Sequence, residues 1–246
     1  MNYLDINTLL GSRPDTPIDV EAARLDELLE SQGISQAVTA SLAGTAWHFG
    51  ETNLATLRVC EKHARLLPAA MVDPRSYFGK EDVVLQARQQ GFVMLKLFNR
   101  LQDWPLDFSP VEVIFQEAHE AGLPVMVDAV RYGDITRAAQ LGAVTETPVI
   151  VAGVGHDMLS EAVVCMTEFA DLYVETSLLA IAQPHPAPDA LKVLCEEVGP
   201  ERILFGTGAP LGNPGSVKVA LETSSLTDQD IRSIASLNAL GLLRNP

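Results

Sequence analysis

The stretch PVIVAGVG (Pro148–Gly155) is apolar at almost every position. A β-strand with one solvent-exposed face alternates apolar and polar residues, whereas a parallel strand buried on both faces is apolar throughout. The next segment, Met158–Phe169, spaces its apolar residues as one face of an amphipathic helix does. Together the two segments predict a buried parallel strand followed by a helix that covers the sheet.

The same alternation of strand and helix extends in both directions along the chain. Seven further β-rich runs have this character: Asn2–Ile6, Gln36–Ser41, Ala69–Val72, Phe92–Leu97, Pro124–Val127, Leu172–Thr176 and Arg202–Phe205. Amphipathic stretches lie between them, at Asp19–Gln32, Asn53–Ala64, Lys80–Gln90, Ser109–Ala121, Asp134–Leu141 and Ala187–Glu197. Eight such units with short, right-handed connections predict a single (β/α)8 barrel, a TIM barrel of the α/β class, as one domain over residues 1–246.

An open, doubly wound sheet is the alternative arrangement of alternating strands and helices. That fold places a glycine-rich, phosphate-binding loop after its first strand. The corresponding segment here is NTLLG (Asn7–Gly11), which is not such a loop. The chain has no internal repeat and no linker-like composition, and its 246 residues match the usual length of a barrel. The barrel is therefore the preferred fold.

The composition excludes several classes of partner. The 32 acidic residues outnumber the 17 Lys and Arg residues, which gives a net charge of −15. Such a charge repels nucleic-acid backbones and anionic membrane surfaces, and no apolar run reaches the roughly 18 residues of a membrane-spanning helix. The three cysteines suggest no disulfide framework, and the N-terminus has no basic region typical of a signal peptide. We expect a cytoplasmic protein that binds neither nucleic acid nor membrane.

Seven segments, in their order along the chain, resemble motifs of a known family. They are LDINTLLG (Leu4–Gly11), AAMVDPR (Ala69–Arg75), GFVMLKLF (Gly91–Phe98), AGLPVMVDA (Ala121–Ala129), PVIVAGVG (Pro148–Gly155), ERILFGTGAP (Glu201–Pro210) and LTDQDIRSIASLNALGLL (Leu226–Leu243). Their order and spacing are similar to those of the amidohydrolase-related superfamily, in particular its amidohydrolase 2-like members. The resemblance covers nearly the whole chain and implies the barrel fold of these metal-dependent hydrolases.

The resemblance also places the family's metal ligands, four histidines and one aspartate, at positions that here hold Asn7, Leu9, Asp128, Gly153 and Gly208. Leucine and glycine have no ligating side chain, and catalytic zinc needs three or four N, S or O donors. Asn7 and Asp128, together with Asp5, offer at most oxygen atoms, which suit a hard cation such as Mg²⁺. We therefore expect no metal and no other cofactor, with metal-dependent hydrolysis lost. A rebuilt metal site is the alternative.

Asp128 and Lys96 are the candidate catalytic residues. Ligands of barrel proteins bind at the C-terminal ends of the strands, where both residues are predicted to lie. Asp128 follows a run of apolar residues and is expected to be buried, so Lys96 on the neighbouring strand is its natural counter-ion. Two interpretations stay open, a structural ion pair and an acid–base pair with displaced pKa values.

Five further residues are candidates for substrate binding. Asp5 and Asn7 share the interior face of the first strand. Arg131, in the loop after the fifth strand, could bind a substrate carboxylate with its guanidinium fork. His156 could replace a lost ligand after the sixth strand, and His48, after the second, could stack on a bound molecule. For each of them a structural or solvated role is the alternative.

Two functions of different classes are compatible with these residues. In the first, the barrel has lost its metal site and binds a small, anionic metabolite, with Lys96 and Arg131 as the positive charges. In the alternative, it is a hydrolase or decarboxylase that acts on a small carboxylic acid or lactone, with Asp128 as base and Lys96 as electrostatic stabiliser, or with a rebuilt metal site. The resemblance implies these two reactions. A homo-oligomer formed through the outer helices is compatible with either function.

Overall fold

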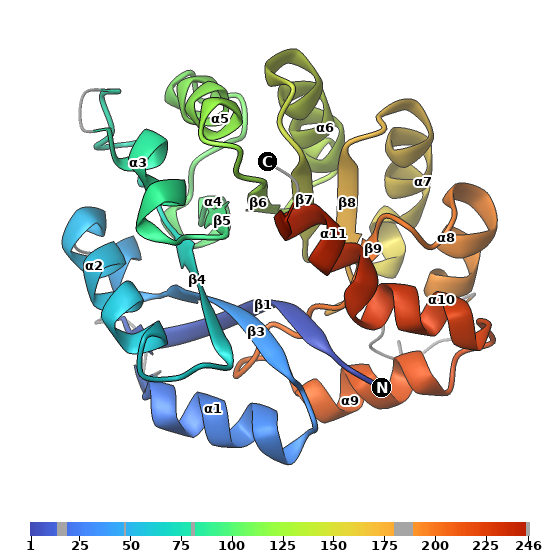
Figure 1. The fold of residues 1–246 in the computed structure, drawn as a ribbon. Helices are drawn as coiled ribbons and strands as arrows, with labels where there is room; N and C mark the ends of the chain where they lie inside the picture. The colour runs from blue at the N-terminus through green and yellow to red at the C-terminus, as the bar shows by residue number, and fades with distance from the viewer. Residues whose placement is uncertain (14–18, 47, 80–81, 180–188, 245–246) are drawn as a thin grey trace.

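The computed structural model describes residues 1–13, 19–46, 48–79, 82–179 and 189–244 (Figure 1). Within these residues, eight parallel strands follow one another around the sheet in chain order. They are β1 (Leu4–Ser12), β3 (Gln36–Ser41), β4 (Leu66–Ala70), β5 (Met94–Lys96), β6 (Val125–Asp128), β7 (Val149–Ala152), β8 (Leu172–Glu175) and β9 (Ile203–Leu204). A ninth strand, β2 (Asp19–Val20), pairs antiparallel with the end of β1.

The sheet closes into a barrel because the chain after β9 returns to β1. Ile6 donates its backbone N–H to the carbonyl of Phe205 at 2.8 Å, and Gly208 donates to the carbonyl of Asn7 at 2.9 Å. Leu9 in turn donates to the carbonyl of Ala209 at 2.8 Å. A closed sheet leaves no unpaired edge between its first and last strands. The predicted (β/α)8 barrel is therefore confirmed.

Helices surround the strands (Figure 1). In chain order they are α1 (Ala22–Ser31), α2 (Phe49–Cys60), α3 (Val83–Gln90), α5 (Pro110–Glu120), α6 (Asp134–Thr145), α7 (Leu159–Glu168), α8 (Ala190–Val198) and α9 (Pro214–Glu222). The C-terminal segment adds α10 (Asp228–Arg232), the π-helical turn η3 (Ser233–Leu237) and α11 (Asn238–Arg244). Each buries an apolar stripe against the sheet, as Leu25 and Leu29 of α1 illustrate. None of the described helices is long and apolar enough to cross a membrane.

The strands supply the core of the barrel. All four residues of β7, Val149–Ala152, are buried, which confirms the two-sided burial that their apolar run predicts. Short helical segments lie instead in the loops at the carboxyl ends of the strands. These are η1 (Ala43–Thr45) after β3, α4 (Asn99–Gln102) after β5 and η2 (His156–Met158) after β7. The loops at this end of the barrel therefore carry additional structure that can hold side chains over its mouth.

Several element boundaries differ from those that the sequence predicts. The strand predicted at Ala69–Val72 instead spans Leu66–Ala70, and Pro68 within it, which has no N–H to donate, accepts a hydrogen bond from Val93 through its carbonyl. The helix predicted at Asn53–Ala64 ends at Cys60, since His63 and Arg65 turn back to bond Asp26. Residues 80–81 and 187–188, at the starts of two predicted helices, lie outside the described residues.

Candidate functional site

A cavity of about 430 Å³ lies at the carboxyl ends of the barrel strands. Barrel proteins bind their ligands at this end, where loops from different strands converge. Both polar and apolar residues line the cavity. The residues that line it are Asn7, Leu9, Lys96, Phe98, Arg100, Leu101, Asp128, Ala152, Gly153, Ser177, Leu178, Thr207, Gly208, Leu211 and Gly212.

Lys96 ends β5 and lines the cavity. The side chain is only 3% exposed. Its Nζ donates a hydrogen bond to Asn7 Oδ1, lies 3.5 Å from Met126 Sδ, and sits 5.5 Å from the centre of the Phe98 ring. Burial lowers the pKa of Lys96 because it disfavours the charged form, and the negative charge of Asp128 opposes this effect.

Asp128, at the end of β6, is partly buried and lines the same cavity. Its backbone is fixed by the Asn99 side chain, which accepts from the Asp128 N–H at 2.9 Å and donates to the Asp128 carbonyl at 2.8 Å. Among the described residues, the Asp128 carboxylate has no hydrogen bond and no ion pair within 4.0 Å. Burial raises the pKa of Asp128, and the positive charges of Lys96 and Arg100 oppose this. The predicted direct ion pair with Lys96 is therefore not formed, although the two groups face one cavity.

Asp5 lies beneath the cavity and is fully buried. Its Oδ1 accepts hydrogen bonds from the backbone N–H groups of Asn7 at 3.0 Å and Thr207 at 3.1 Å, and its Oδ2 accepts from the Thr207 hydroxyl. Burial raises the pKa of Asp5 to about 7, and the hydrogen bonds from Thr207 and Asn7 limit this rise. Asp5 thus orients two cavity-lining residues, and it is not among the lining residues itself.

A second buried carboxylate, Glu175 at the end of β8, holds the adjacent loops. It accepts hydrogen bonds from the backbone N–H of Gly153 at 3.0 Å, and from the hydroxyl and the backbone N–H of Ser177 at 2.6 and 2.7 Å. Burial raises the pKa of Glu175, and the donors from Ser177 oppose that shift. The alternation of Glu175 and Ser177 is the sequence signal for this arrangement, because both side chains share one face of the strand.

Besides Asp5, three more of the predicted substrate-binding residues are not among the described residues that line the cavity. The Arg131 side chain is 72% exposed, and its nearest ion pair, at 3.7 Å, is with Asp103. His48 is exposed and stacks on Phe49, with 5.3 Å between the ring centres. His156 is partly buried in η2, where its Nδ1 has no hydrogen-bond partner among the described residues. The arginine that lines the cavity is Arg100 and not the predicted Arg131.

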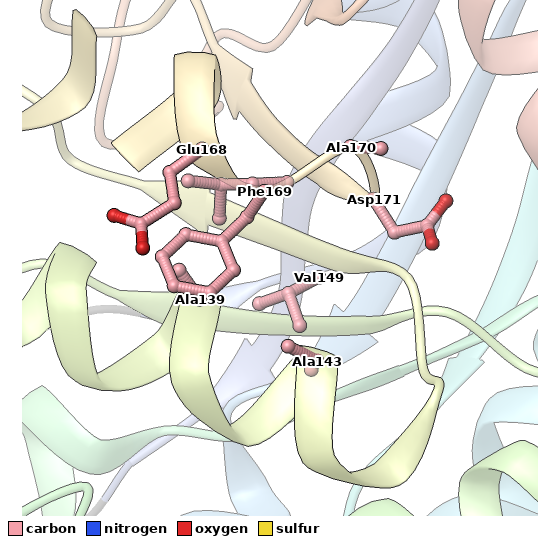
Figure 2. A pocket seen from close by; sticks show the side chains of 9 residues that line it. Ala139, Ala143, Val149, Glu168, Phe169, Ala170 and Asp171 are labelled. Atoms are coloured by element: carbon pink, nitrogen blue, oxygen red, sulfur yellow. The ribbon is translucent and has the colours of Figure 1, made fainter. Parts of the chain in front are cut away.

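Two other cavities lie at the opposite end of the barrel. One, of about 180 Å³, lies between α6, α7 and the start of β8, where the Phe169 ring packs near Ala139 (Figure 2). Figure 2 shows the carboxylates of Glu168 and Asp171 on opposite sides of that ring. The other, of about 600 Å³, lies beside Tyr173 and α11. Neither contains Lys96 or Asp128, so the cavity at the carboxyl ends of the strands is the candidate site.

The donor set is small at the positions to which the sequence resemblance assigns metal ligands. Leu9 and the two glycines have no donor side chain, the Asn7 amide oxygen already accepts from the Lys96 ammonium, and Asp128 provides a carboxylate. Gly153 and Gly208 have φ angles of +79° and +67°, which L-residues rarely adopt. In the part of the chain that the structure describes, no group of three His, Cys, Asp or Glu side chains is arranged to hold a metal ion.

The closed barrel and its cavity define the class of protein, an α/β barrel with a cavity at the carboxyl ends of its strands. A family model described as amidohydrolase matches residues 3–244, so the chain belongs to this amidohydrolase family. A comparison with curated proteins finds no match.

Solved structures with the same fold cover almost the whole chain. A 5-carboxyvanillate decarboxylase from Sphingomonas paucimobilis is 13% identical, with a TM-score of 0.76 over 100% of this chain and 99% of that chain. A dihydroxybenzoic acid decarboxylase from Polaromonas sp. JS666, solved with manganese and 2-nitroresorcinol, is 15% identical, with a TM-score of 0.72 over 99% and 97%. A candidate 2-pyrone-4,6-dicarboxylic acid hydrolase from Pseudomonas putida is 17% identical, with a TM-score of 0.76 over 98% and 97%. At these identities the likeness shows the fold alone.

Proposed function

We propose that the cavity binds a small organic acid through its carboxylate, without a metal ion at the family's ligand positions. The observation that carries this proposal is the presence of two cations, Lys96 and Arg100, in one cavity of a chain with a net charge of −15. Neither forms an ion pair within 4.0 Å with a described residue. An anionic ligand would therefore supply the negative charge that no described side chain places in contact with these two cations.

The remaining walls of the cavity suit an apolar ligand body. Leu9, Phe98, Leu101, Leu178 and Leu211 all line it. Small-molecule sites typically combine such apolar walls with a few polar groups that fix the orientation of the ligand, and occupy about 300–1,000 Å³. The volume of about 430 Å³ is at the lower end of that range, which favours an acid with one ring or a short chain.

The donor set supports the metal-free part of the proposal. A catalytic zinc ion needs at least three donors, and a divalent ion beside Asn7 would meet the positive charge of Lys96. The residues present therefore do not fit the family's metal ion.

Catalysis on the bound acid is the second candidate, and the pKa shifts favour it. Burial raises the pKa of Asp128 and lowers that of Lys96, so the neutral forms of an acid and a base become accessible in one cavity. Asp128 would exchange a proton with the substrate, and Lys96 would stabilise negative charge as it develops. The structural neighbours include decarboxylases of aromatic acids and a candidate hydrolase, which agrees with decarboxylation or hydrolysis.

Calorimetric titration of the chelator-treated full chain tests the binding proposal. Benzoate and 2,6-dihydroxybenzoate serve as ring-bearing carboxylates, and benzamide as the control without a charge. We expect the carboxylates to bind and benzamide to bind at least about tenfold more weakly, because hydrogen bonds to charged groups contribute about 1.5–3 kcal/mol. Equal binding of benzoate and benzamide would contradict a carboxylate site.

Elemental analysis tests the metal-free part separately. The protein is incubated with Zn²⁺, Mn²⁺ or Mg²⁺ in turn and dialysed exhaustively before measurement. We expect contents near zero for all three ions. Near-stoichiometric zinc or manganese would instead mean that Asp128, His156 or a neighbour has rebuilt a metal site, and the protein would then be a metal-dependent enzyme.

A further inference from the structure

We propose that the Lys96 amine is a nucleophile that forms a covalent imine with the ketone group of a small β-keto acid. This inference rests on the carboxylate-binding function proposed above and assigns to it a substrate class and a covalent intermediate. Lys96 is then a catalytic residue whose nitrogen reacts with the substrate. A purely electrostatic role would require only the positive charge of Lys96.

The contacts of Lys96 separate it from an ordinary buried ion-pair lysine. Its Nζ bonds the amide oxygen of Asn7 and lies 3.5 Å from the thioether of Met126, and both of these groups are neutral. No described carboxylate lies within 4.0 Å of this nitrogen. Because an ammonium group is costly to bury without a contacting anion, the neutral, nucleophilic amine of Lys96 becomes accessible beside its charged form.

The carboxylates around Lys96 act on it only from a distance. Asp128, Glu175 and Asp5 all favour its charged form, yet burial outweighs them and lowers the pKa of Lys96. Asp5 and Glu175 direct their oxygens to other donors, namely Thr207 in one case and Ser177 in the other. Desolvation of this kind is a general way in which proteins activate a lysine for Schiff-base chemistry.

The same cavity holds the two other groups that a keto acid requires. The Arg100 guanidinium lines it and can receive the substrate carboxylate. The Asp128 carboxyl group has no described hydrogen bond to occupy it, and its raised pKa suits proton transfer. A β-keto acid is the class that combines a carboxylate for Arg100 with a ketone for Lys96 in a molecule small enough for the cavity.

The chemical steps balance without any oxidant or reductant. The Lys96 nitrogen forms a bond to the ketone carbon while the C=O π pair moves to oxygen, which takes a proton from Asp128. Loss of water then leaves a protonated imine on Lys96. The bond to the carboxylate carbon breaks, carbon dioxide leaves, and the electron pair enters the imine to give an enamine. The enamine carbon takes up a proton from solvent water, which gives a new protonated imine. Water hydrolyses this imine to release a ketone and regenerate the Lys96 amine, and the proton set free returns to Asp128.

Borohydride trapping of the full chain tests the proposal. The protein is incubated with acetoacetate, treated with sodium borohydride, and analysed by intact mass and peptide mapping. Borohydride reduces an imine to a stable secondary amine, so we expect one isopropylated residue after decarboxylation, located at Lys96. The wild-type chain suffices, so the result does not depend on whether a variant folds. Lys96→Arg, which keeps the charge, and Lys192→Met, which removes a half-exposed lysine, are the matched variants.

The outcomes distinguish this inference from the function on which it rests. Adducts that depend on acetoacetate, map to Lys96, and disappear in Lys96→Arg but persist in Lys192→Met would support it. Absence of an adduct, or adducts spread over exposed lysines, would overturn it. If benzoate still binds in that case, only the covalent step fails. If benzoate does not bind either, the proposed carboxylate site fails as well.

Discussion

The Asp5 carboxylate on β1 accepts hydrogen bonds from both the backbone N–H and the hydroxyl of Thr207, just after β9. These two residues lie 202 positions apart in the chain, so their contact joins the first and last strands of the barrel. Both are buried, Asp5 fully. Because Asn7 and Thr207 each line the cavity and both contact Asp5, closure of the barrel and geometry of the site depend on the same carboxylate.

The substitution Thr207→Val tests the contribution of this contact to stability. It would leave one Asp5 oxygen without its hydroxyl donor, and the Ala209 N–H without the acceptor it now has at 3.2 Å. We expect the free energy of unfolding to fall by about 1–3 kcal/mol, as is usual for buried polar groups that lose a partner. Thr223→Val is the control, because Thr223 is exposed, and we expect it to change stability by less than about 0.5 kcal/mol. Urea unfolding measures both, and equal effects would contradict the role of Thr207.

Asp5 also predicts a dependence of stability on pH. Its pKa is about 3.9 in an unfolded chain and about 7 in the folded one. Between these values the folded state retains a proton that the unfolded state has released, so stability falls as the pH rises. Asp5→Asn removes this contribution and makes the slope between pH 4 and pH 7 shallower. Glu175, whose pKa is also raised, keeps part of the slope. Urea unfolding at several pH values measures it, and an unchanged slope would disprove the assignment.

Much of the fold is predictable from the sequence because burial on both faces leaves a clear apolar pattern. The run at Val149–Ala152 is one example, and the structure has a strand there. The strand β2 is not predictable in the same way. Asp19 and Val20 continue the apolar spacing of the following helix, yet they pair with Ser12 and Gly11. Such pairing depends on where the chain turns back, which periodicity does not encode.

The site is predictable only in part, because side-chain direction depends on the loops. Lys96 and Asp128 end neighbouring strands, and the structure brings both to one cavity. Arg131 is three residues beyond Asp128, and there the loop has already left the barrel mouth. Arg100 lines the cavity because it lies in α4, which begins soon after β5 ends. A sequence pattern that identifies strand ends does not say which loop folds over them.

Arg100 and Arg131 therefore form a matched pair for testing ligand recognition. Both residues are exposed, but Arg100→Gln removes a positive charge that lines the cavity, whereas Arg131→Gln removes one that does not. We expect Arg100→Gln to weaken benzoate binding by about 10- to 100-fold, the effect of losing a charge-assisted hydrogen bond. Arg131→Gln is expected to bind within about twofold of the unsubstituted chain. Calorimetric titration compares the two, and the reverse order would restore Arg131 as the binding residue.

Asp128→Asn separates a catalytic role for Asp128 from a structural one. Its carboxylate forms no described hydrogen bond or close ion pair, so we expect a change in unfolding free energy below about 1 kcal/mol. Benzoate binding should be unchanged or tighter, because a negative charge beside the ligand is removed. The rate of turnover of the organic-acid substrate should fall by about 100- to 10,000-fold, the usual effect of losing a general acid or base. A loss of several kcal/mol in stability with turnover intact would indicate a structural carboxylate.

Gly153→Ala tests whether the backbone accepts a side chain at a position to which the sequence resemblance assigns a metal ligand. Gly153 has a φ of +79°, and a Cβ there would lie 3.3 Å from the Ala129 carbonyl oxygen. We expect a loss of about 1–2 kcal/mol in unfolding free energy, the cost of the left-handed region for an L-residue. Gly241→Ala is the control, since Gly241 is in α11 with nothing within 4 Å of its added Cβ, and alanine there should stabilise the helix by up to about 1 kcal/mol. Thermal or urea unfolding compares the two variants. If Gly153→Ala were as stable as the parent chain, the loop would shift to a backbone conformation that L-residues commonly adopt, without a loss of unfolding free energy. A histidine could then be restored at this position without altering the fold.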